Sequence, residues 1–151
     1  MSTQHRTEEK FSIALESIQS KRRIERVLEA ANALLDRYAA QPDPEERLKI
    51  TFELLRRNFT PEVAIVFGNM ALGTDSPVGI AGTEAVPPGE RRGETVFHCK
   101  IIGADRRSGS LTAFYTEPGT MGLTDAEWLA AMRLLAGISG LGVGGHVTCP
   151  Q

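Results

Sequence analysis

Glycine is missing from the whole front part of this 151-residue chain, since all fifteen glycines lie at or after Gly68. Glycine is costly inside helices and useful in tight turns. Charge is distributed the opposite way, because 21 of the 36 charged residues fall within the first sixty positions. We therefore expect helices in the front part, and strands joined by tight turns from about Gly68 onward.

Other scarcities narrow the class of protein. Only two cysteines are present, which excludes a disulfide-rich scaffold and a cysteine-based zinc cage. No apolar run approaches the length that crosses a bilayer, and the polar first residues lack a signal-peptide core. A net charge of −2 argues against nucleic-acid binding. We expect one cytoplasmic globular domain with neither a membrane nor a nucleic acid as partner.

Apolar residues recur at helical spacing from about residue 8 to residue 38. Phe11, Leu15 and Ile18 begin this stripe, and the polar residues 19–23 interrupt it, which could mark a break in the helix. The near-heptad rhythm leaves two interpretations open: a helix packed on its own domain, or a helix that pairs with a second copy. In the second case the dimer contacts would come from Ile24, Val27, Leu28, Ala31, Leu34 and Leu35. A dimer could also form through a closing helix within residues 124–140, or through both helices.

Two further helices carry start signals. Asp43 is a favourable N-cap and Pro44 suits the first turn, so we predict a helix that ends near Phe59. Thr124 and Glu127 have the spacing of a capping box, which predicts a last helix over residues 124–140.

Between these helices the periodicity becomes extended. Residues 63–67 form an apolar run typical of a central strand, residues 77–82 a weaker candidate, and residues 110–116 another strand. Residues 94–102 alternate, with Phe97 and Cys99 on one face and His98 and Lys100 on the other. We predict an α+β domain with an antiparallel sheet and the first and last helices on one face. Its parts are a helical lead (1–40), the domain proper (41–145) and a flexible tail (146–151).

The pattern at the end of the chain resembles a GAF domain. Residues 108–116 match that family's "x-G-x-L-x-hydrophobic" strand, and Leu123, Thr124 and Glu127 match the start of its closing helix. The resemblance spans about residues 25–143, and PAS, profilin-like and roadblock-type folds can give similar patterns. It implies a non-enzymatic regulatory domain in signal transduction. Such domains bind a small molecule or only dimerise, and pass signals through their terminal helices to an attached output domain.

The chain departs from that family where a ligand-binding member has a long cap. Only about ten residues, 84–93, separate the second strand candidate from the third. A ligand pocket needs walls that bury most of the ligand, and so short a segment provides little material for them. The departure argues against a tightly enclosed ligand. A ligand would lie on the sheet face opposite the terminal helices, with the lining residues Phe67, Asn69, Phe97, Cys99 and Tyr115.

No catalytic constellation, metal site or cofactor motif is apparent, so we expect no enzyme activity and assign no cofactor. Two alternatives to the sensor remain: a ligand-free interaction scaffold, and a redox-active cysteine protein. Cys99 is the only residue that suggests the second alternative. His98 is adjacent to Cys99, and adjacent strand residues point to opposite faces, so the two are not expected to pair. Residues 144–151 are typical of the start of a connection, which suggests an excised part of a longer protein.

Overall fold

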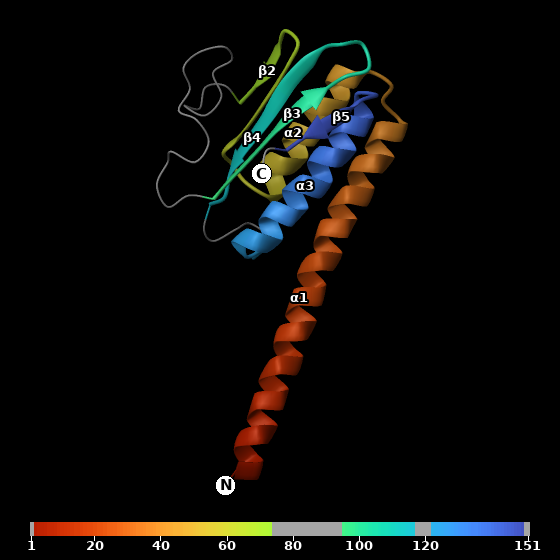
Figure 1. The fold of residues 1–151 in the computed structure, drawn as a ribbon. Coiled ribbons are helices and arrows are strands. Elements are labelled where there is room, and N and C mark those ends of the chain that lie inside the picture. Colours follow the sequence, from red (N-terminus) through yellow and green to blue (C-terminus); the bar gives the residue numbers. More distant parts are fainter. Residues whose placement is uncertain (1, 74–94, 117–121, 150–151) are drawn as a thin grey trace.

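A computed structural model describes residues 2–73, 95–116 and 122–149. Figure 1 shows three helices on one side of a sheet, with α2 and α3 packed against the strands. The described strands form a five-stranded antiparallel sheet in the order β2-β1-β4-β3-β5. The α+β class and the placement of the terminal helices on one side are confirmed. In chain order the elements are α1 (Ser2–Ala39), α2 (Pro44–Asn58), β1 (Val63–Phe67), β2 (Met70–Leu72), β3 (Val96–Ile102), β4 (Ser108–Phe114), α3 (Asp125–Gly142) and β5 (His146–Thr148).

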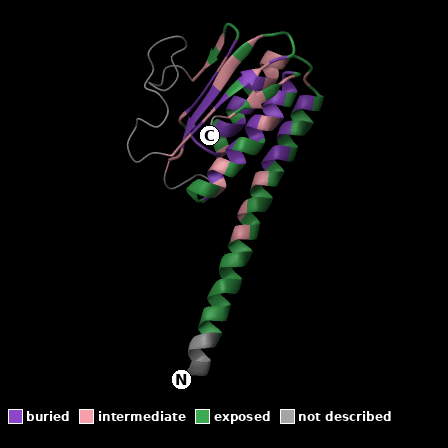
Figure 2. Ribbon diagram, viewed as in Figure 1, coloured by how far each residue is buried: buried purple, intermediate pink, exposed green. Residues whose placement is uncertain are grey.

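Helix α1 is continuous through residues 19–23, so the break considered there does not occur in the backbone. Its second half packs on α2 and α3 and contributes Ala30, Ala31, Leu34 and Tyr38 to the core. Its first half extends away from the domain, and residues 7–19 are exposed (Figure 2). The division at residue 40 is therefore corrected, because the domain core includes the second half of α1.

The start signals of α2 and α3 act as predicted. The Asp43 carboxylate accepts the backbone N–H of Glu46 at 3.1 Å. At α3, the Thr124 hydroxyl accepts the N–H of Glu127 at 3.2 Å, and the Glu127 carboxylate accepts the N–H of Thr124 at 2.9 Å. These bonds satisfy N–H groups that have no partner within the helix.

Three predicted strands are present, with β4 beginning two residues earlier than expected. Two short edge strands were not predicted. Strand β2 follows β1 through a two-residue turn in which Gly68 has a φ of +59°. Strand β5 corrects the prediction of a flexible tail for residues 146–148, because these residues pair with β3. The strand candidate at 77–82 lies outside the described residues.

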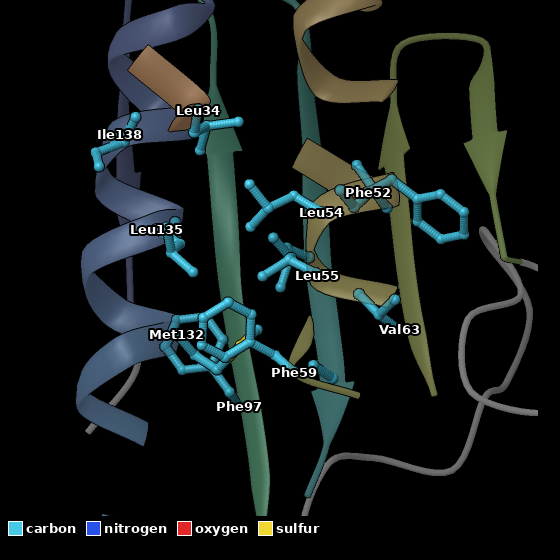
Figure 3. Packing of buried hydrophobic residues seen from close by; sticks show 14 of the residues in the cluster. Leu34, Phe52, Leu54, Leu55, Phe59, Val63, Phe97, Met132, Leu135 and Ile138 are labelled. Atoms are coloured by element: carbon cyan, nitrogen blue, oxygen red, sulfur yellow. The ribbon is translucent and has the colours of Figure 1, made fainter. Parts of the chain in front are cut away.

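The core lies between the sheet and the helix layer. Helix α2 packs on β1, and α3 packs on β3 and β5. Alternate residues of the central strands point into this layer, and Figure 3 shows how Phe97 of β3 lies beside Phe59 and Met132. One face of the sheet is thus occupied by the chain's own helices.

Candidate functional site

The residues expected to line a ligand lie mainly on the wrong face for that role. Phe67 and Cys99 are 0% exposed, and Phe97 is 5% exposed. All three belong to the core cluster that packs under α2 and α3. The prediction that they line the face opposite the helices is therefore corrected: their side chains fill the helix side.

The other two expected residues lie elsewhere. Tyr115 is half-buried against the same core, where its hydroxyl donates to the carbonyl oxygen of Leu123 at 2.6 Å. Its ring meets that of Trp128 edge to face, with centroids 5.5 Å apart. Asn69 is exposed in the turn between β1 and β2. The five residues therefore do not converge on one site.

The opposite face of the sheet has a different set of residues. His98 and Thr112 face each other across β3 and β4, and the His98 Nδ1 lies 2.8 Å from the Thr112 hydroxyl oxygen. Burial lowers the pKa of His98, and the positive charge of Lys100 lowers it further. The pleat also places Ala64, Val66, Val96, Ile102, Ser110 and Phe114 on this face. The alternation in the sequence separates this set from the core set. The prediction of which set faces away from the helices is wrong.

Cys99 is in a setting that suppresses nucleophilic chemistry. Burial, and next the neighbouring Cys149 thiol, raise the pKa of Cys99 to about 12. A thiol with that pKa is almost entirely protonated at neutral pH, whereas the thiolate is the attacking species. The geometry therefore gives no support to Cys99 as the nucleophile of an enzyme.

An apolar surface lies where α1 crosses α3. A groove of about 420 Å³ runs between these helices. Ile24 and Leu28 of α1 are about half exposed beside it, and Leu134 of α3 is 41% exposed. The groove is lined by Ile24, Val27, Leu28, Leu123, Ala126, Glu127, Ala130, Ala131 and Leu134.

This surface includes some of the expected dimer residues and excludes others. Leu34 is fully buried and Ala31 nearly so, both in the chain's own core, so neither is available to a partner. Val27 is partly buried against that core. Ile24, Leu28 and Leu35 are exposed, as are two residues that sequence reasoning missed, Leu134 and Leu141 of α3. The seven-residue spacing of those two leucines is the signal that could have found them. We call Ile24, Leu28, Leu35, Leu134 and Leu141 the α1–α3 face.

A bidentate ion pair joins α1 to α3 beside the groove. The Arg23 guanidinium donates from Nε to the Glu127 Oε1 at 3.0 Å and from a terminal nitrogen to Oε2 at 3.3 Å. Burial raises the pKa of Glu127, but hydrogen bonds from Thr124 and Arg23 outweigh it, so the pKa is lowered. The same carboxylate therefore caps α3 and holds α1.

A second junction fixes the C-terminal end of α1. The Tyr38 hydroxyl bonds to that of Thr51 in α2, and the Ser139 hydroxyl in α3 donates to the same Thr51 oxygen at 3.1 Å. Arg47 donates to the carbonyl oxygens of Tyr38 at 2.9 Å and of Gly142 at 3.1 Å. A cation at two helix C-termini is favourable. The second half of α1 is thus tied to both α2 and α3.

Among the helices that the structure describes, none combines the length and apolar composition needed to span a bilayer. Within those same ranges, no three His, Cys, Asp or Glu side chains gather closely enough to hold a metal ion. Comparison of the chain with protein-family models, curated proteins and solved structures gave no significant match.

Proposed function

We propose that this chain is a GAF-like, cytoplasmic, non-enzymatic regulatory module that acts by pairing with a second copy through the α1–α3 face. The observation that carries the proposal is the exposure of large apolar side chains on two adjacent helices, with a groove between them. Contiguous exposed apolar surface commonly marks an interaction site. The α+β fold, with its terminal helices on one side of an antiparallel sheet, is also the fold that the resemblance implies.

A second copy of the chain is the occupant that best fits this surface. Under two-fold symmetry the same patch meets itself, and the leucine-rich face of α1 and α3 can then form a four-helix contact. The charges beside the continuation of this face on α1 are of both signs, with Glu16 and Lys21 flanking Ser17 and Ser20. Mixed charges beside an apolar seam allow interhelical ion pairs between identical helices.

The first half of α1, which projects from the domain, gives a second reason to propose pairing with another copy of the chain. Its residues 7–19 are exposed and include Phe11, Ile13, Leu15 and Ile18. Most helical stability in proteins comes from the packing of an apolar face, and isolated helices are marginal in water. Pairing with the α1 of a partner would supply that packing, and we propose that the projecting half of α1 is stabilised in this way.

The proposed mechanism is mechanical coupling along α1. The Arg23–Glu127 pair and the Tyr38, Thr51 and Ser139 cluster hold α1 against α3 and α2. A change in how α3 packs in the dimer would therefore move α1 as well. Such a shift between two packing states is a common way to pass a signal to an attached output domain.

Charge placed in the α1–α3 face should abolish pairing. We expect Leu28→Glu and Leu134→Glu to elute as single chains in size-exclusion chromatography with light scattering, while the unaltered chain elutes as a dimer. Burial of one unpaired carboxylate in an apolar contact costs several kcal/mol. Ala33→Glu is the matched control, because Ala33 is exposed on the opposite side of α1. Equal masses for Leu28→Glu, Ala33→Glu and the unaltered chain would contradict the proposal.

Of the two forms of this function, the ligand-free scaffold is the better supported. Phe67 and Phe97, the aromatic residues expected to contact a ligand, are used in the core. The sensor would have to use the other sheet face, around His98 and Thr112. A rise in the melting temperature with a metabolite, lost in Thr112→Val but kept in the exposed-residue variant Ala33→Glu, would instead support the sensor.

A further inference from the structure

The two cysteines of the chain lie opposite one another on neighbouring strands. Cys99 is in the middle of β3, and Cys149 directly follows β5. These strands are antiparallel, with Lys100 opposite Thr148 and Ile101 opposite Val147. The same register, continued by one residue, places Cys149 opposite Cys99.

Both thiols lie on the helix side of the sheet. Cys99 is part of the core cluster, and Cys149 packs against that cluster. The two thiols also interact directly with each other. Residues directly opposite in antiparallel strands have Cα atoms about 4.5–5.5 Å apart. That separation falls within the range of about 4.4–6.8 Å found in disulfides, so the backbone need not move far.

We propose that Cys99 and Cys149 form a reversible cross-strand disulfide that fastens the edge strand β5 to β3 under oxidising conditions. This modification site is independent of the proposed dimer. A disulfide in an intracellular protein is typically transient and redox-sensing rather than structural. The pair would therefore report on the redox state of its surroundings.

The two cysteines have different parts in the reaction. Cys149 is partly exposed at the sheet edge, so a small disulfide such as oxidised glutathione reaches it first. Its thiol loses a proton, and the thiolate attacks one sulfur of the small disulfide and displaces the first small thiolate, which takes up a proton. Cys99 then loses its proton, attacks the Cys149 sulfur and expels the second small thiol. The chain loses two electrons, and the small disulfide is reduced to two thiols.

The buried position of Cys99 protects it from direct attack and makes it suitable for the second step. Cys99 is 0% exposed, and burial raises its pKa to about 12. A free thiol in that setting is unreactive toward solutes. Its contact with Cys149 makes the closing step intramolecular, which compensates for the small thiolate fraction.

The bond would act on a short edge strand of the sheet. Strand β5 has only three residues, and its His146 and Thr148 side chains are exposed. Short edge elements open at lower free energy than the core. A Cys99–Cys149 bond would close a loop of about 50 residues that contains β4, α3 and β5. We expect it to raise the melting temperature by roughly 10 °C.

The test uses the full chain, equilibrated with mixtures of reduced and oxidised glutathione and then quenched by acid and alkylated. We expect the reduced chain to take up two alkyl groups. As the mixture becomes oxidising, a form should replace it that takes up none and is about 2 Da lighter than the unalkylated reduced chain, because two hydrogens are lost. A peptide containing Cys99 should be linked to one containing Cys149, and dithiothreitol should reverse both changes and the rise in melting temperature. Cys149→Ser should show none of these changes, while Thr148→Ser, a matched change in β5, should retain all of them.

Three results would overturn the proposal. Both cysteines could remain open to alkylation after oxidation, each could carry its own glutathione, or Cys149 could link two chains together. Each of these results is read on the unaltered chain by its intact mass and by non-reducing electrophoresis. The decision therefore does not depend on how well Cys149→Ser folds.

Discussion

Two glycines of α3 have very different surroundings. A Cβ added at Gly142 would lie 2.6 Å from the ring of Tyr38, whereas one added at Gly137 would have no atom within 4 Å. We expect Gly142→Ala to lower the free energy of unfolding by about 1–3 kcal/mol, because the buried ring must shift. Gly137→Ala should raise it by about 0.5–1 kcal/mol, because alanine favours the helix. Urea denaturation measures both changes in the free energy of unfolding. If the two substitutions had equal effects, Gly142 would not pack against the Tyr38 ring as described.

A single carboxylate, that of Glu127, should make the stability pH-dependent. Its pKa is lowered in the folded chain, because hydrogen bonds from Thr124 and Arg23 outweigh the effect of burial. A lowered pKa stabilises the fold above the unfolded value, about 4.3, and this gain is lost as pH falls through the folded value. Glu127→Gln should therefore cost about 0.5–1 kcal/mol at neutral pH, and this cost should disappear as the pH falls through the lowered pKa of Glu127.

Thermal melting at several pH values measures this difference. Arg23→Met should remove part of the same pH dependence, because it deletes the partner of the carboxylate. If the difference in melting temperature between the unaltered chain and Glu127→Gln stayed constant across the whole pH range, the charge of Glu127 would not contribute. Only its role in capping α3 would then matter.

At the scale of elements, α1 has two halves with different roles. Residues 7–19 are exposed, whereas Leu34 and Tyr38 are buried in the core. Deletion of residues 1–19 should change the free energy of unfolding of the single chain by less than about 0.5 kcal/mol, since the side chains described there, those of residues 7–19, are exposed. Leu34→Ala should cost about 2–5 kcal/mol.

Both changes are best compared in the Leu28→Glu background, so that pairing does not contribute to the measured stability. Urea denaturation followed by circular dichroism gives the free energy and the helix content together. A large loss of stability on deletion would show that the first half of α1 folds back onto its own domain.

Local signals explain which elements could be predicted from the sequence. Helices α2 and α3 begin with caps that act within a few residues, at Asp43 and Thr124. Strand β3 alternates by itself. Strands β2 and β5 have three residues each and are defined by their partners, so no local pattern identified them.

The face of the sheet could not be predicted for a related reason. In β3 the core set includes Phe97 and Ile101, while the opposite set includes Val96 and Ile102, so both sets are partly apolar. Which set meets the helices depends on tertiary packing. The approach of Cys149 to Cys99 depends in turn on β5, and the exposure of Leu28 and Leu35 on how α1 crosses α3.

At the scale of the whole molecule, we expect two kinds of association. The α1–α3 face would join two chains through apolar helix packing, and the cysteine pair would join two strands within one chain. The two act at different places, because the cysteines lie at the sheet and Leu134 faces outward from α3. Oxidation and dimerisation can therefore be measured independently.

Sedimentation equilibrium of the full chain under reducing conditions shows whether two chains pair through their helices. We expect a mass of twice the 16.4 kDa of one chain, which falls to that of one chain in Leu28→Glu and stays doubled in Ala33→Glu. A mass of 16.4 kDa for the unaltered chain at every concentration up to the highest attainable would contradict it.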